Sequence, residues 1–171
     1  MSFKGLTALL AVALLGFGCQ NPRNRVKLPE YAQVIYPDSV QNPSFSAILN
    51  NDRPKIITLS NMNCFRMIDI PLLQRQIAEN PEFDFIFYVE NETPTEELKR
   101  FVSDNRLPIV LFVDKDQEYR KKNAIHSIVS YVSRVVDADL QVCTTTMVGS
   151  PVSQFYQVMP QVRKQLHLKT D

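Results

Sequence analysis

The feature that most constrains this chain is an alternation of two hydrophobic patterns after Pro54. Short runs rich in β-branched and aromatic residues, typical of buried strands, alternate with longer segments whose apolar residues recur every three or four positions, typical of helices. We expect strands at residues 55–59, 83–89, 108–113, 130–136 and 140–148, and helices at 64–78, 95–105, 117–123 and 153–167.

This order predicts an α/β fold. Strand–helix–strand units join parallel neighbours through right-handed crossovers. The short turn Asp137–Asp139 between the last two strands favours an antiparallel hairpin. We therefore expect a central mixed sheet of parallel strands plus a C-terminal antiparallel hairpin, flanked by helices. Pro71 should kink the first helix, and Pro160 should bend the last one.

Residues 28–54 are harder to assign, because four prolines interrupt them. Residues 31–36 have the composition of a strand, and residues 45–49 fit either a short strand or a helical turn. We interpret 28–54 as an N-terminal extension that packs on a domain formed by residues 55–168.

The start of the chain has the pattern of a targeting signal. Lys4 precedes an apolar run from Leu6 to Phe17, which has the length of a signal-peptide core and is short for a bilayer span. The stretch Leu15–Cys19 resembles the lipobox of bacterial lipoproteins, in which cleavage precedes a cysteine that then carries lipid. An uncleaved anchor or a buried helix is the alternative.

The lipobox resemblance implies a signal peptide at residues 1–18 and lipidation of Cys19. Residues 19–27 would form a polar tether, and the domain would lie in the bacterial cell envelope, attached to a membrane by the lipid. Without Lys4 the chain has 18 basic and 18 acidic residues. Attachment would therefore rest on the lipid rather than on charge.

Composition excludes several classes of protein. Beyond Cys19 the chain has one glycine, Gly149, so a glycine-rich phosphate loop or a dinucleotide fingerprint has no place in it. The remaining two cysteines and two histidines cannot make a four-cysteine zinc site, and we predict neither a metal nor a cofactor. The near-zero net charge argues against nucleic acid as a partner.

Three local patterns, taken with the strand order, resemble the thioredoxin fold in its redoxin form. Cys64–Met67 follows the first strand, where thioredoxins have Cys-x-x-Cys at the start of a helix. Phe112–Ile125 is similar to the strand and short helix inserted in membrane-anchored thioredoxin-like proteins. Val135–Val152 looks like the ending of thioredoxin-like envelope lipoproteins, an apolar pair with Asp, a turn, a strand and Gly-x-Pro. The resemblance covers about residues 50–168.

The chain departs from that family at the positions that carry chemistry. Met67 replaces the second redox cysteine, and Asn63 replaces the tryptophan that usually precedes the first. Phe65 and Arg66 are the two residues between Cys64 and Met67. The cis-proline that faces the active cysteine should fall near Val132, where the sequence has no proline.

Cys64 is the candidate nucleophile. Unpaired N–H groups and the partial positive charge of a helix N-terminus stabilise a thiolate, and Arg66 could add charge or point to solvent. Because the thioether of Met67 cannot resolve a mixed disulfide, the chemistry would be monothiol. The alternative is a redox-inactive module that binds a protein or peptide in the groove beside Cys64.

The other candidate residues carry weaker signals. We expect Cys143 to be a small packing residue in a strand, too far from Cys64 for a disulfide. His126 follows a short helix, and His167 suits the C-terminal end of the last one. The acidic residues Glu90, Glu92, Glu96 and Glu97 and the basic run Arg120–Lys122 are most simply solvated.

Overall fold

A computed structural model of the chain describes residues 25–29, 33–35, 47, 49–90, 95–107, 109–114, 116–125 and 132–168. The predicted signal peptide, Cys19, the tether up to residue 24, Glu92 and His126 lie outside these ranges. Within them, no helix is both long and apolar enough to cross a bilayer. The elements in chain order are β1 (Gln33–Ile35), β2 (Lys55–Ser60), α3 (Met62–Arg66), α4 (Ile70–Ala78), β3 (Asp84–Glu90), α5 (Thr95–Asp104), β4 (Val110–Asp114), α6 (Glu118–Lys122), β5 (Val132–Val136), β6 (Val142–Thr146) and α7 (Phe155–Gln165).

The described strands form one mixed sheet in the order β1-β4-β3-β2-β5-β6. β2, β3 and β4 are parallel, whereas β5 is antiparallel to β2 and β6 is antiparallel to β5. The predicted parallel core and C-terminal hairpin are therefore confirmed. β1 pairs antiparallel with β4, so the segment 28–54 contributes an edge strand as well as packing on the domain.

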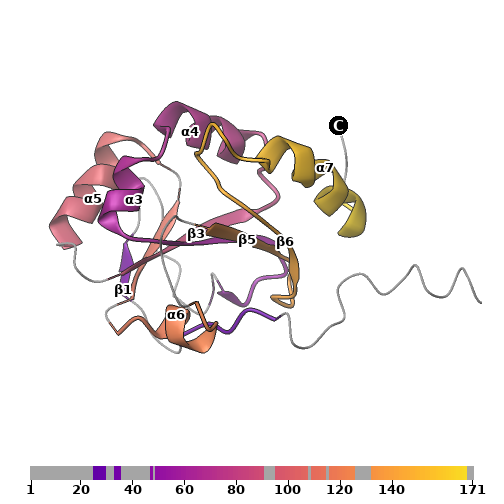
Figure 1. Cartoon of the computed structure of the whole chain (residues 1–171), viewed down its shortest axis with the longest axis horizontal. Coiled ribbons are helices and arrows are strands. Elements are labelled where there is room, and N and C mark those ends of the chain that lie inside the picture. Colours follow the sequence, from indigo (N-terminus) through magenta and orange to yellow (C-terminus); the bar gives the residue numbers. More distant parts are fainter. Residues whose placement is uncertain are drawn as a thin grey trace, which may run out of the picture.

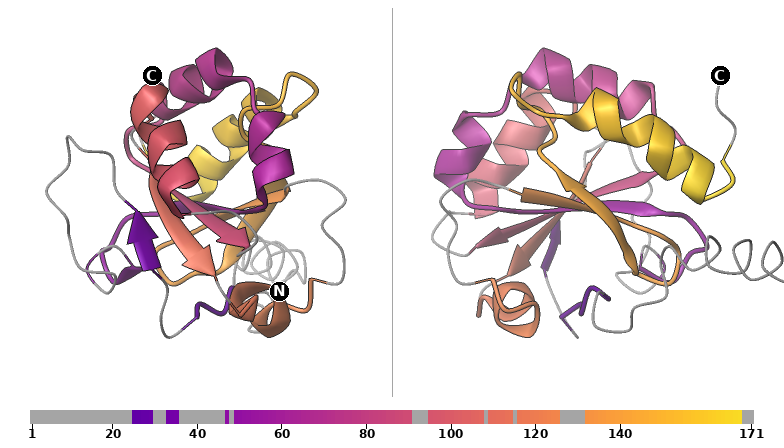
Figure 2. Two further views of the ribbon diagram at one scale, coloured as in Figure 1. Left: turned by 90° about the vertical axis from the view of Figure 1, so that its left-hand side faces the viewer. Right: turned by 45° about the vertical axis from the view of Figure 1, so that its right-hand side comes forward.

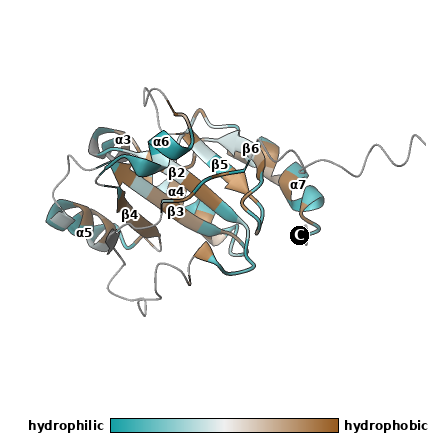
Figure 3. Cartoon of the chain, turned by 90° about the horizontal axis from the view of Figure 1, so that it is seen from below, coloured by the Kyte–Doolittle hydropathy of each residue, from teal (hydrophilic) through white to brown (hydrophobic). Residues whose placement is uncertain are grey.

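Helices cover the two faces of the sheet unequally (Figures 1 and 2). α4, α5 and α7 lie on one face, which we call the upper face, and α6 lies on the other, the lower face. Alternate side chains of a strand point to opposite faces. On β3, Phe85, Phe87 and Val89 join the upper core, whereas Ile86 and Tyr88 join the lower core. Figure 3, seen from the α6 side, shows the hydrophobic strands beneath this largely hydrophilic helix.

The helix predicted at 64–78 is two helices. The backbone leaves the helical conformation after α3, and Asp69 then caps α4 by accepting the N–H of Leu72 at 2.9 Å. Pro71 lies in the first turn of α4, where its missing N–H would have had no partner inside the helix. The prediction of a kink was wrong, because this proline starts a helix. In α7, by contrast, Pro160 lies inside the helix as predicted.

Residues 25–29 of the N-terminal segment contact the folded domain. Arg25 forms an isolated antiparallel bridge with Gln141, and the Val26 N–H donates to the Leu140 carbonyl at 2.9 Å. The Val26 side chain is 2% exposed within the lower core. Arg25 and Val26, which fall within the predicted tether 19–27, thus contact the domain.

Candidate functional site

Cys64 lies where the central strand β2 passes into α3, at the edge of the sheet formed by the carboxyl ends of the parallel strands. We call this the carboxyl edge. Asn61 ends the strand, and its side-chain oxygen accepts the Cys64 N–H at 2.9 Å. This is an N-cap interaction, and it satisfies a donor at the start of the helix. The sequence therefore places Cys64 in the first turn of a helix, as predicted.

The Cys64 side chain points inward. It is 7% exposed and belongs to the upper core. Asn63 and Arg66 of α3 are exposed, and Met67, just past the end of the helix, is 75% exposed. The Met67 N–H donates to the Cys64 carbonyl at 3.1 Å, which closes the turn between the two motif positions. Phe65 also lies on α3. The Cys64 side chain is therefore largely covered in this conformation.

Arg66 does not direct its charge toward Cys64. Its guanidinium forms an ion pair with Glu97 Oε1 of α5 at 3.0 Å, and its side chain is 63% exposed. Of the two roles weighed from the sequence, the structure supports the solvent-facing one. Glu96 likewise pairs with Lys99 on the surface of α5.

The start of β5 occupies the position where a cis-proline was sought. Val132 pairs with Leu59 near the carboxyl end of β2 and is 46% exposed. None of the described peptide bonds is cis. Val132 and Met67 are thus two exposed apolar side chains at the same edge of the sheet as Cys64.

Cys143 lies in β6 and packs, partly exposed, against the upper core. No disulfide joins it to Cys64. β5 separates β6 from β2, so the two strands are about 10 Å apart, beyond the Cα separation of roughly 7 Å that a disulfide tolerates. The prediction of a packing role is confirmed. His167, exposed and just past the end of α7, also lies where the sequence placed it.

Two residues expected to be solvated are instead buried or half-buried. Glu90 ends β3 and is 8% exposed, and its carboxylate lies 3.3 Å from the Arg120 guanidinium of α6. Glu90 at the end of β3 pairs with Asp114 at the end of β4, and both residues contact α6. One residue of the acidic stretch and one of the basic run thus form an ion pair. The sequence alone did not show this pair because the two residues lie far apart along the chain.

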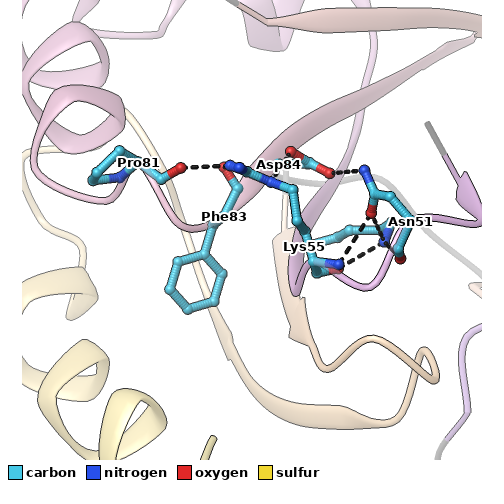
Figure 4. Close-up of polar contacts among 6 residues, drawn as sticks. Asn51, Lys55, Pro81, Phe83 and Asp84 are labelled. Carbon is cyan, nitrogen blue, oxygen red and sulfur yellow. Dashed lines mark hydrogen bonds and ion pairs between the residues drawn. The ribbon is translucent and has the colours of Figure 1, made fainter. Parts of the chain in front are cut away.

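Sequence reasoning also missed a polar network at the opposite edge of the sheet, the amino edge (Figure 4). Lys55 is fully buried, and its ammonium group donates to Asn51 Oδ1 at 2.8 Å and to the Arg53 carbonyl at 2.7 Å. Asp84 accepts from Asn51 at 2.7 Å and pairs with Arg53 at 2.8 Å, while Arg53 also donates to the Pro81 carbonyl. Burial lowers the pKa of Lys55. The polar residues just before β2 are the sequence signal from which this network could have been predicted.

A groove of about 490 Å³ lies beside the start of α4. Its walls include Leu72, Arg75, Ser150 and Tyr156, with the Arg75 guanidinium 5.8 Å from the centre of the Tyr156 ring. The groove is therefore amphipathic. Within the described ranges, no three metal-ligating side chains gather into a cluster.

Comparison with known proteins locates the fold but gives no close relative. No protein-family model matches the chain, and no curated protein matches it. Among solved structures, a candidate thiol:disulfide interchange protein DsbE from Chlorobium tepidum superposes with a TM-score of 0.59 at 13% identity, covering 84% of this chain and 97% of that one.

Two further solved structures agree with this one. A candidate thioredoxin from Neisseria meningitidis gives a TM-score of 0.56 at 17% identity, covering 80% of this chain and 89% of its own. StoA from Bacillus subtilis gives 0.51 at 16% identity, covering 80% and 98%. The strand order, the helices on both faces and these superpositions lead to one conclusion: the chain has the thioredoxin-like fold of the redoxin type.

Proposed function

We propose that this chain is a thioredoxin-like protein of the bacterial cell envelope, anchored to a membrane through lipid on Cys19, in which Cys64 takes part in thiol–disulfide exchange. The observation that carries the redox part is the position of Cys64 in the first turn of the helix after the central strand. A solved structure with the same fold is named as a thiol:disulfide interchange protein.

The chemistry is that of a single thiol. The Cys64 thiolate attacks one sulfur of a partner's disulfide, a new S–S bond forms, and the partner's other sulfur leaves as a thiolate that takes up a proton. Met67 has no ionisable sulfur, so the mixed disulfide lasts until a second thiol, from a protein or a small molecule, attacks it. That attack, at the partner's sulfur, forms a disulfide between the partner and the second thiol and expels Cys64 as a thiolate, which takes up a proton.

Burial of Cys64 should limit the rate of this chemistry. Because Cys64 is 7% exposed, exchange needs local opening of α3. α3 has five residues and is held by the Asn61 cap and the surface ion pair of Arg66 with Glu97. Opening this one helix exposes far less apolar surface than global unfolding, so it should occur more often.

Thiol reactivity in the folded protein tests the proposal. The unlipidated Cys19→Ser protein is treated with an aromatic disulfide that releases a coloured thiolate, and the rate is compared with global unfolding in the same buffer. We expect reaction at Cys64 to be faster than unfolding, to disappear in Cys64→Ser and to persist in Cys143→Ser. Reaction at Cys64 only at the rate of global unfolding would rule out the redox role.

A gain of function provides a second test. Met67→Cys restores the spacing of a dithiol motif at two positions already joined by a turn hydrogen bond. If Cys64 occupies the nucleophile position, this variant should form an internal disulfide under mild oxidation, seen as a loss of two hydrogens by mass spectrometry. Val152→Cys, on an exposed loop residue, is the control and should leave Cys64 reduced.

A second candidate function is a redox-inactive binding module. It draws on the covered sulfur of Cys64 and on the amphipathic groove lined by Arg75 and Tyr156. A peptide with apolar and acidic residues would match a groove that offers an aromatic ring and a guanidinium. In this case Cys64→Ser would retain partner binding, whereas Tyr156→Ala would lose it.

A further inference from the structure

The N-terminal segment enters the fold at the amino edge of the sheet. Arg25 bridges Gln141, which closes the hairpin that follows Val136. Val136 pairs with Lys55, the first residue of β2. Cys64, by contrast, follows the last residue of β2. The point where the chain joins the domain and the candidate thiol therefore lie at opposite ends of the central strand.

The chain between the lipidation site and the domain is short. Six peptide units join Cys19 to Arg25, and a fully extended chain of that length spans at most about 20 Å. A folded domain of this size has a radius of gyration of about 15 Å, hence a diameter of about 38 Å. A point on its surface held within about 20 Å of a membrane therefore lies at or below about the level of the domain's centre.

We infer that, in the anchored protein, the amino edge of the sheet faces the lipid surface and the carboxyl edge with Cys64 faces away from it. The inference rests on the lipid anchor of the proposed function. The membrane-facing surface comprises the hairpin Asp137–Gln141 and the turn Asn51–Arg53. Cys64 and the neighbouring exposed Met67 and Val132 are thereby presented to soluble partners.

Tether length, rather than charge, fixes this orientation. The exposed charged residues of the membrane-facing surface, together with Arg25, which adjoins it, are of both signs: Arg25, Asp52, Arg53 and Asp139. Such a mixture has little net attraction for an anionic bilayer. The orientation should therefore persist in neutral lipid and weaken when the tether is lengthened.

The chain contains no tryptophan, so one introduced residue can report orientation. Full-length, lipidated Ala138→Trp and Met67→Trp proteins are inserted into phosphatidylcholine vesicles that carry a dansyl-labelled headgroup lipid, and energy transfer from tryptophan to dansyl is measured. Ala138 and Met67 are both exposed and lie at opposite edges. We expect severalfold more transfer from Ala138→Trp. Equal transfer, or more from Met67→Trp, would overturn the inferred orientation.

Lengthening the tether provides the matched control. About twelve Gly and Ser residues inserted between Asn24 and Arg25 add about 40 Å of contour and should bring the two signals together. A difference that survives the insertion would show that the surface, not the tether, orients the domain, and would overturn the mechanism inferred here.

Flotation separates failure of the orientation from failure of the anchor. If the wild-type chain floats with vesicles and Cys19→Ser does not, the anchor is present. The energy-transfer comparison then tests the orientation alone. If neither floats, the anchor and the orientation fail together. The redox role is judged independently, because Cys64 reactivity is measured on the unlipidated protein.

Discussion

At the scale of single residues, Gly149 is a point of close approach between three segments. Its φ is +66°, in the left-handed region. A Cβ built there would lie 2.6 Å from Ile68 Cγ2 and 3.3 Å from Leu73 Cβ. Its N–H donates to Gln76 Oε1 at 2.7 Å, and its carbonyl accepts the Asp69 N–H at 2.8 Å. The one glycine beyond Cys19 thus fastens the loop after β6 to the start of α4.

Gly149→Ala should destabilise the protein strongly. The left-handed conformation costs an L-residue about 1–2 kcal/mol, and overpacking against Ile68 adds roughly 1–3 kcal/mol. Urea unfolding should therefore show a loss of about 2–5 kcal/mol. The neighbouring Ser150→Ala should change stability by no more than about 0.5 kcal/mol. Equal effects at the two positions would contradict the close-approach argument.

Two buried tyrosines make stability sensitive to alkali. Tyr88 and Tyr119 stack with ring centroids 4.4 Å apart and are almost fully buried. Burial raises the pKa of Tyr119 to about 12 and also raises the pKa of Tyr88. In the unfolded chain both hydroxyls ionise near pH 10. Between these values the folded state holds more protons than the unfolded state, so stability falls as pH rises.

We expect the free energy of unfolding to decline above about pH 10, and to decline less steeply in the double variant Tyr88→Phe/Tyr119→Phe. Urea titrations at neutral pH and at about pH 11 measure the difference. Tyr156→Phe is the comparison, since burial also raises the pKa of Tyr156, but at 45% exposure its contribution to the alkaline decline should be the smaller one. A double variant that kept the full alkaline decline would show that other groups cause it.

At the scale of elements, the end of α6 holds the N-terminal segment. The Asn123 side-chain amide donates to the Lys27 carbonyl at 2.7 Å, and its oxygen accepts the Lys27 N–H at 3.0 Å. The same amide donates to the Tyr119 carbonyl at 2.8 Å and so also caps the helix. One side chain therefore joins α6 to residues 25–29 across the lower face.

Asn123→Ala should loosen residues 25–29 while leaving the sheet intact. Loss of these partly exposed hydrogen bonds should cost about 1–2 kcal/mol, and hydrogen exchange at Val26 and Lys27 should speed up. Asn105→Ala removes a matched helix-end bond, to the Phe101 carbonyl at 2.7 Å, without touching the N-terminal segment. Faster exchange at Val26 in both variants would mean that the effect is global.

The elements also show where sequence patterns reach their limit. β2, β3 and β4 could be predicted because each is a short apolar run between polar turns, whereas β5 and β6 were predicted as a hairpin around the turn Asp137–Asp139. The break between α3 and α4 could not, because the apolar spacing of Phe65, Ile68 and Leu72 continues across it. The break depends on the Asp69 cap and on the contact of Asp69 with Gly149, a residue far along the chain.

At the scale of the whole molecule, the strand order and hairpin could be predicted because crossover rules leave few arrangements. The orientation of the Cys64 side chain could not, since the helical pattern gives its place in the chain but not which side of α3 meets the core. The pairing of Glu90 with Arg120 was missed for the same reason, because it forms only through a contact between β3 and α6. Lys55 is instead bound by Asn51 and Arg53 just before it in the chain, and only its burial depends on the neighbouring strands β3 and β5.

For the lipid anchor proposed above, charge balance predicts how the protein should leave a membrane. Residues 19–171 carry 18 basic and 18 acidic residues, so electrostatic attraction to anionic lipid should be weak. Molar salt or alkaline carbonate should leave the protein with the membrane fraction, and detergent should release it. Cys19→Ser should appear in the soluble fraction. Release of the wild-type chain by salt alone would point to a peripheral, charge-based attachment.

The pairing of Val26 with Leu140 has a consequence for the order in which the molecule is made. The first residues of the domain find their backbone partners in the last hairpin. Ribosomes deliver Val26 long before Leu140, so the lower core lacks this lining until most of the chain has emerged. Val26 can therefore take its place in the lower core only once the last hairpin is present.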